Sequence, residues 1–110
     1  MPHAKPKLVQ VYRHMLEKHI VQKIMRWLRA NGFWCVKIHG GEFQQAGLPD
    51  VLAIRDGRAC WFEVKRPGGK ATPLQARTIA ILKEYGCTAG VVYSIEDVVR
   101  LLDEQDKIVL

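Results

Sequence analysis

The stretch DVLAIRDGRACWFEVK, which runs from Asp50 to Lys65, decides how this chain folds. Residues 50–55 and 58–65 are rich in branched and aromatic side chains, which favour β-strands. Between them lies Asp56-Gly57, a dipeptide typical of a two-residue type I′ hairpin turn. We therefore predict two antiparallel strands whose register is fixed by this turn.

The predicted register places two carboxylates face to face. Asp50 lies opposite Glu63, and Lys65 shares a face with Glu63 because side chains alternate along a strand. Opposed side chains are about 5 Å apart, and at an effective dielectric near 20 two such charges repel by about 3 kcal/mol. A proton on one acid, a neighbouring cation or a bound divalent metal would relieve this repulsion. The residues favour a Mg²⁺ or Mn²⁺ site, and an ion-pair cluster with Lys65 is the alternative.

The flanking sequence predicts further helices and strands. A helix is expected from about Tyr12 to Ala30, because apolar side chains recur every three or four residues and Asn31-Gly32 ends it. Residues 1–11 are expected to form a loose basic arm. The other predicted elements are a strand at 33–39, a polar loop at 40–49, a basic loop at 66–70, a helix at 73–85, a strand at 88–93 and a last helix from 95.

Two capping boxes mark the starts of the later helices. Thr72 and Gln75 form the first box, with Pro73 at the first helical position, and Ser94 and Asp97 form the second. The side chains of the middle helix predicted to face inward are Leu74, Ile81, Leu82 and Tyr85.

The order α-β-β-β-α-β-α contains a strand–helix–strand unit, which implies one parallel strand pair beside the hairpin. We therefore predict a single α/β domain over residues 1–110, with a mixed central sheet flanked by helices.

Composition narrows the function. The net charge of +6 and the pI near 9.5 suit a polyanionic partner such as nucleic acid, although a basic solvated surface would give the same values. No apolar run is long enough for a membrane span or a secretion signal, so we expect a cytoplasmic protein. The three cysteines lack zinc-site spacing and are interpreted as reduced core thiols.

Two more polar residues are placed by helix geometry. Glu17 falls at the edge of the buried face of the first helix, from which it could reach toward the hairpin, but its position also suits a solvated flank. Gln75 lies in the first turn after the hairpin and its loop, and its capping role alone would account for it.

The ordered motifs Gly47-Leu48-Pro49-Asp50, Phe62-Glu63-Val64-Lys65 and Thr72-Pro73-Leu74-Gln75 resemble the PD-(D/E)xK nuclease superfamily. More narrowly, they resemble its virus-type replication-repair nuclease (VRR-NUC) domains, over nearly the whole chain. This resemblance implies a restriction-endonuclease-like αβββαβ core and a metal-dependent DNA endonuclease that uses Mg²⁺ or Mn²⁺.

The resemblance also implies roles for individual residues. Asp50 and Glu63 would hold the metal together with the backbone carbonyl of Val64. Lys65 would position or activate the attacking water, and Gln75 would orient these groups.

Glu17 would be the acid contributed by the first helix and a further candidate metal ligand.

Short stand-alone members of the family, many of them encoded by phages, resemble Holliday-junction resolvases that act as homodimers. By this resemblance the substrate is branched DNA. The residues expected to bind DNA are Lys5, Lys7, Arg66 and Lys70. The alternatives are a general DNA nuclease and a basic nucleic-acid-binding module without catalysis. A restriction-type enzyme is disfavoured because 110 residues leave little room for a base-reading element.

Overall fold

The computed structural model describes residues 4–39 and 46–108, with side chains described over 7–39 and 46–104. The chain forms α1 (Ala4–Ala30), β1 (Trp34–Lys37), β2 (Val51–Arg55), β3 (Arg58–Val64), α2 (Pro73–Glu84), β4 (Thr88–Val92) and α3 (Ile95–Ile108). The predicted order of helices and strands is therefore confirmed.

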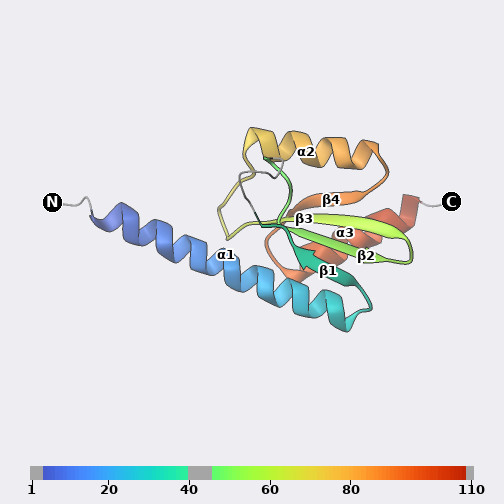
Figure 1. Ribbon diagram of the computed structural model, residues 1–110, viewed down its shortest axis with the longest axis horizontal. Helices are drawn as coiled ribbons and strands as arrows, with labels where there is room; N and C mark the ends of the chain where they lie inside the picture. The colour runs from blue at the N-terminus through green and yellow to red at the C-terminus, as the bar shows by residue number, and fades with distance from the viewer. Residues whose placement is uncertain (1–3, 40–45, 109–110) are drawn as a thin grey trace.

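The four strands form one mixed sheet in the order β1-β2-β3-β4. β1 and β3 are each antiparallel to β2, whereas β3 and β4 are parallel. α1 and α3 pack on one face of the sheet, and α2 covers the other face (Figure 1). The predicted α/β architecture with a mixed sheet and one parallel pair is confirmed.

The hairpin turn sets the register of the two central strands. Asp56 and Gly57 both have positive φ angles, 53° and 75°, as a type I′ turn requires. The pairs run from Arg55 opposite Arg58 to Val51 opposite Phe62, which is the predicted register. β2 begins one residue after Asp50, so this carboxylate lies at the entrance of the strand.

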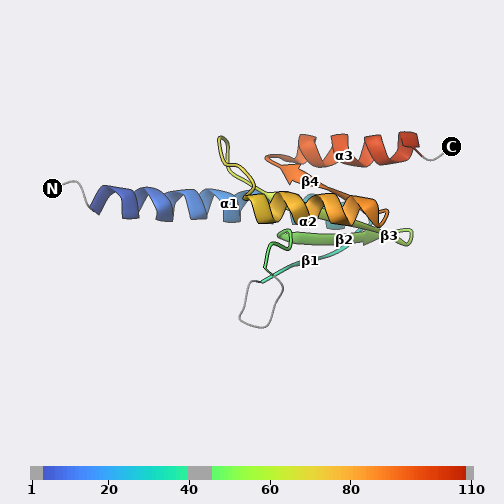
Figure 2. The ribbon, with the colours of Figure 1, turned by 90° about the horizontal axis from the view of Figure 1, so that it is seen from above.

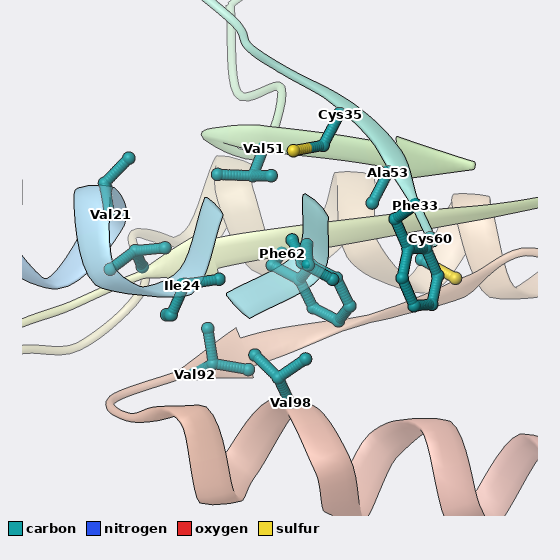
Figure 3. Packing of buried hydrophobic residues seen from close by; sticks show 12 residues of the cluster. Val21, Ile24, Phe33, Cys35, Val51, Ala53, Cys60, Phe62, Val92 and Val98 are labelled. Carbon is teal, nitrogen blue, oxygen red and sulfur yellow. The ribbon is translucent and has the colours of Figure 1, made fainter. Parts of the chain in front are cut away.

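The main hydrophobic core lies between the sheet and the α1–α3 layer. Phe62 at its centre is fully buried, and Ile24 from α1 and Val98 from α3 pack around it (Figure 3). Cys35 and Cys60 belong to this core, and burial raises the pKa of both thiols. The core holds α1 against the strands that carry the carboxylates.

The prediction of a loose arm before Tyr12 is wrong for the described residues, because α1 begins at Ala4. Pro6 falls in the first turn of this helix, where a missing backbone N–H breaks no helical hydrogen bond. The N-terminal half of α1 extends past the sheet in both views (Figures 1 and 2).

The predicted inward face of α2 is wrong for Leu74, Ile81 and Tyr85, whereas Leu82 is half-buried. Leu74, Ile81 and Tyr85 are 49%, 42% and 83% exposed, whereas Thr78 and Ile79 are buried. The sheet covers the side of α2 that carries Thr78, Ile79 and the half-buried Leu82, so the apolar pattern selected a face rotated away from the sheet.

The capping box of α2 forms as predicted, and that of α3 forms in part. The Ser94 hydroxyl accepts from the backbone N–H of Asp97 at 3.3 Å. The Asp97 carboxylate accepts from the backbone N–H of Tyr93 at 2.9 Å, one residue before the predicted donor. Over the described residues, no helix combines the length and apolar character needed to cross a bilayer.

Candidate active site

Asp50 is held across the hairpin by a hydrogen bond to the neighbouring strand. Its Oδ2 accepts from the backbone N–H of Val64 at 2.8 Å. This bond fixes the Asp50 carboxyl group beside the end of β3, at the position that the hairpin register predicts.

Glu63 lies in β3, and Lys65, two residues later, directly follows the strand. Glu63 is only 2% exposed, and its Oε2 lies 3.5 Å from Nζ of Lys65. Its Oε1 is buried without a hydrogen-bond partner among the described residues. A buried polar atom without a partner carries a desolvation cost, so this oxygen is a candidate ligand atom.

The surroundings of Glu63 favour its protonated form. Burial raises its pKa from 4.5 to about 8, the negative charge of Asp50 adds to this increase, and the Lys65 ammonium opposes it. The described residues around Glu63 therefore do not fully compensate its ionised form at neutral pH.

Glu17 lies near the strand ends as the sequence suggested. It is half-buried on α1 and lines a cavity of about 330 Å³ together with Asp50 and Val64. A helix-borne acid and a hairpin carboxylate thus face a common space.

The same cavity contains basic residues that the sequence analysis missed. His14 and Lys18 contribute from α1, and Lys37 and His39 contribute from β1 and the residues after it. Side chains alternate along β1, so Lys37 and His39 lie on the same side as the buried Cys35, which faces α1. This alternation is the sequence signal that could have identified them.

Gln75 has the structural role that the capping box predicts. Its Oε1 accepts from the backbone N–H of Thr72 at 2.9 Å, and the Thr72 hydroxyl accepts from the backbone N–H of Gln75 at 3.1 Å. Gln75 is half-buried at the start of α2, on the same side of the helix as Thr78 and Ile79. It therefore begins the helix face that packs on the sheet.

The loop after β3 is tied to the end of β4. The Tyr93 hydroxyl donates to the Gly69 carbonyl at 2.9 Å. A Cβ on Gly69 would lie 3.1 Å from the Arg66 carbonyl and 3.4 Å from the Cβ of Lys65, so the loop packs closely at this point. Arg66 is half-buried in this loop and Lys70 is exposed.

The two other predicted DNA-binding residues lie at the far end of α1. Lys7 is exposed there, away from the carboxylates, and the side chain of Lys5 lies outside the described residues.

Cavity volume alone does not identify the site. A larger cavity, of about 410 Å³, lies at the turn end of the hairpin and contains one acid, Asp56, among its described lining residues. This acid is exposed and has no carboxylate partner in that cavity, so the smaller cavity beside Asp50 is the chemically relevant one.

The residues at the strand ends fit a hard divalent cation. Neighbouring carboxylates are the ligand type that Mg²⁺ and Mn²⁺ prefer, and Glu63 supplies a buried oxygen without a partner. Within the described part of the chain, no three His, Cys, Asp or Glu side chains are close enough to form a complete metal cluster. A backbone carbonyl and solvent would therefore have to complete the ligand set.

Solved structures with the same fold were found by comparison. One described as a VRR_NUC domain is 26% identical with a TM-score of 0.66, over 80% of this chain and 95% of that one. A second, described as a VRR_NUC domain protein, is 24% identical with a TM-score of 0.67, over 83% and 88%. No protein-family model and no curated protein sequence matches the chain.

The mixed sheet with flanking helices is the fold that this chain shares with the solved VRR_NUC structures, and the carboxylate pair and lysine lie beside its strand ends. Both solved VRR_NUC structures align with most of the chain, which supports the VRR-NUC resemblance of its sequence motifs.

Proposed function

We propose that residues 1–110 act as one nuclease domain that hydrolyses phosphodiester bonds in DNA with Mg²⁺ or Mn²⁺. The observation that carries this proposal is the buried Glu63 beside Asp50 and Lys65, with one carboxyl oxygen lacking a partner, in a VRR-NUC fold. Burying Glu63 beside the half-buried Asp50 costs stability, and acids with strongly perturbed pKa values are typical of active sites.

Four residues would have separate roles at this site. Asp50, Glu63 and the Val64 carbonyl would hold the cation, which when bound polarises a phosphate and lowers the pKa of bound water. Lys65 keeps a positive charge 3.5 Å from Glu63 and would hold the attacking water by hydrogen bonds. Val64 fixes Asp50 through its backbone N–H, so the carboxylate is oriented before any ligand arrives.

Glu17 and Gln75 would act from opposite faces of the sheet. Glu17 shares a cavity with Asp50 and would add a further acid from α1. Gln75 would orient the groups at the strand ends from the first turn of α2, while its capping bond to Thr72 keeps it in place.

Branched DNA is the proposed substrate, and a homodimer is the proposed active form. Resolving a four-way junction requires two symmetric cuts, and a two-fold dimer supplies two sites in matched geometry. Exposed apolar side chains on the projecting half of α1 provide a surface for this pairing. Leu8, Tyr12 and Met15, here called the apolar stripe, share one side of the helix and are 68%, 62% and 53% exposed.

A panel of labelled DNA substrates tests the function. Four-way junctions, flaps, nicked duplex and linear duplex are incubated with the parent protein and Asp50→Asn, with Mg²⁺ or Mn²⁺. We expect the parent to cut the junction fastest and Asp50→Asn to lose activity on every substrate. Binding without cutting by the parent would instead favour a non-catalytic module, and equal cutting of linear duplex would favour a general nuclease.

A further inference from the structure

The excess positive charge of the chain is confined to α1. This helix carries seven Lys or Arg residues and one acid, Glu17, whereas the rest of the chain carries ten basic and ten acidic residues. The formal net charge of +6 therefore lies entirely on one helix. A polyanion approaching the protein is attracted to α1 first.

The two halves of α1 present their apolar side chains in different directions. In the C-terminal half, Ile24 and Leu28 are buried against the sheet. In the N-terminal half, where α1 projects past the sheet (Figure 2), the apolar stripe is exposed. The side that continues toward the cavity carries basic residues instead.

These basic residues are Lys7, His14 and Lys18, here called the α1 track. Spacings of seven and eleven residues are close to two and three whole turns, so the three side chains share one side of the helix. All three are exposed, and His14 and Lys18 line the cavity that contains Glu17. The track is therefore a line of donors that leads out of the candidate active site along α1.

Resting on the proposed nuclease function, we propose that the α1 track binds the sugar-phosphate backbone of the DNA beside the cut position. The eleven-residue separation of its ends corresponds to about 16 Å of helix, which matches the rise of roughly five nucleotides of B-form DNA. Lys37 and His39 on the opposite wall of the cavity would contact the same strand where it enters the site.

Such contacts are independent of base sequence, because phosphate contacts position DNA without reading it. They also make affinity depend on salt, since each neutralised phosphate releases condensed counterions. The track would therefore set where the backbone lies, while the carboxylates act on one bond within it.

DNA binding without metal tests the track separately from catalysis. Fluorescence anisotropy of a fluorescein-labelled duplex is measured in chelator at several salt concentrations. The test variant is Lys7→Gln/Lys18→Gln. The control is Lys23→Gln/Arg26→Gln, which removes the same charge from exposed positions of the same helix that do not line the cavity.

We expect the track variant to bind several-fold more weakly, with a log–log salt slope shallower by about 1 to 2. The control should keep the parent slope and affinity within about twofold. Equal losses of DNA affinity in both variants would show that net charge alone sets affinity. Unchanged binding by the track variant would show that the DNA lies elsewhere on the protein. Either result overturns the proposal. Cutting of the DNA panel by the parent protein is measured separately. A negative result for the α1 track therefore leaves the proposed nuclease function untouched.

Discussion

The Nζ of Lys65 lies 3.5 Å from Oε2 of Glu63, while Oε1 of the same carboxyl group is buried without a hydrogen-bond partner among the described residues. The lysine thus pairs with one carboxyl oxygen, and no described residue pairs with the other. Burial and the neighbouring Asp50 carboxylate raise the pKa of Glu63 to about 8 although an ammonium group lies beside it.

The first prediction concerns stability and pH without metal. The folded-state pKa of Glu63, about 8, exceeds its ordinary value of 4.5, so the folded protein keeps a proton that the unfolded chain releases. The resulting stabilisation is complete below about pH 4.5 and is lost as pH rises to about 8. We expect Glu63→Gln to remove this part of the pH dependence. At pH 8 it should raise Tm by about 4–8 °C, equivalent to about 1 kcal/mol. Parallel Tm profiles for parent and variant would contradict the assignment.

The second prediction separates the metal ligands from the lysine. Asp50→Asn should weaken Mn²⁺ binding by roughly tenfold or more, because a carboxylate ligand is lost. Lys65→Ala should bind Mn²⁺ nearly as well as the parent and lose cutting, because an ammonium group is not a metal ligand. Calorimetric titration with Mn²⁺ measures both affinities. Equal loss of affinity in the two variants would show that these roles are wrongly divided.

The third prediction separates the two roles of Gln75. Gln75→Ala and Thr72→Ala each break the cap of α2 and should each lower the unfolding free energy by about 1 kcal/mol. Only Gln75→Ala should reduce cutting beyond what this stability loss explains, because Thr72 has no proposed role at the strand ends. Denaturant unfolding and single-turnover cleavage are measured on both variants. Matched cleavage rates would leave Gln75 a capping residue only.

The fourth prediction concerns the dimer. If copies pair through the apolar stripe, Leu8→Glu/Met15→Glu should convert the dimer to a monomer, because burying two carboxylates in an apolar contact is costly. Leu74→Glu/Ile81→Glu, at exposed apolar positions of α2, is the matched control and should stay dimeric. Light scattering at micromolar concentration, with and without junction DNA, gives the mass. If the parent protein is a monomer in both conditions, the dimer proposal is wrong. If only the control variant becomes monomeric, the interface lies on α2 instead of the apolar stripe.

Local chemistry predicted the centre of the fold well. A two-residue turn leaves one register for its strands, so the pairing of Val51 with Phe62 followed from Asp56-Gly57 alone. The α2 cap followed equally from Thr72 and Gln75, because both of its hydrogen bonds are local.

Features that depend on tertiary packing were harder to predict from the sequence. Leu74 and Ile81 are exposed on α2 although they are apolar, so periodicity alone did not identify the side around Thr78 and Ile79 that the sheet covers. The basic wall of the cavity was missed because His14 and Lys37 come from elements whose contact no local pattern reveals. The sequence left two alternatives for Glu17, a position toward the hairpin and a solvated flank. It could not choose between them because packing sets how the helix is rotated about its axis.

The most direct test of the central claim is metal-dependent cutting at the carboxylate pair. Single-turnover cleavage of a labelled four-way junction is followed in excess chelator and again after Mn²⁺ is restored, for the parent and for Lys65→Ala. We predict no cutting by the parent in chelator, full recovery with Mn²⁺, and a loss of at least about a hundredfold in Lys65→Ala under the same conditions. Undiminished cutting by the parent in chelator, or parent-like rates for Lys65→Ala, would contradict the assignment of this site.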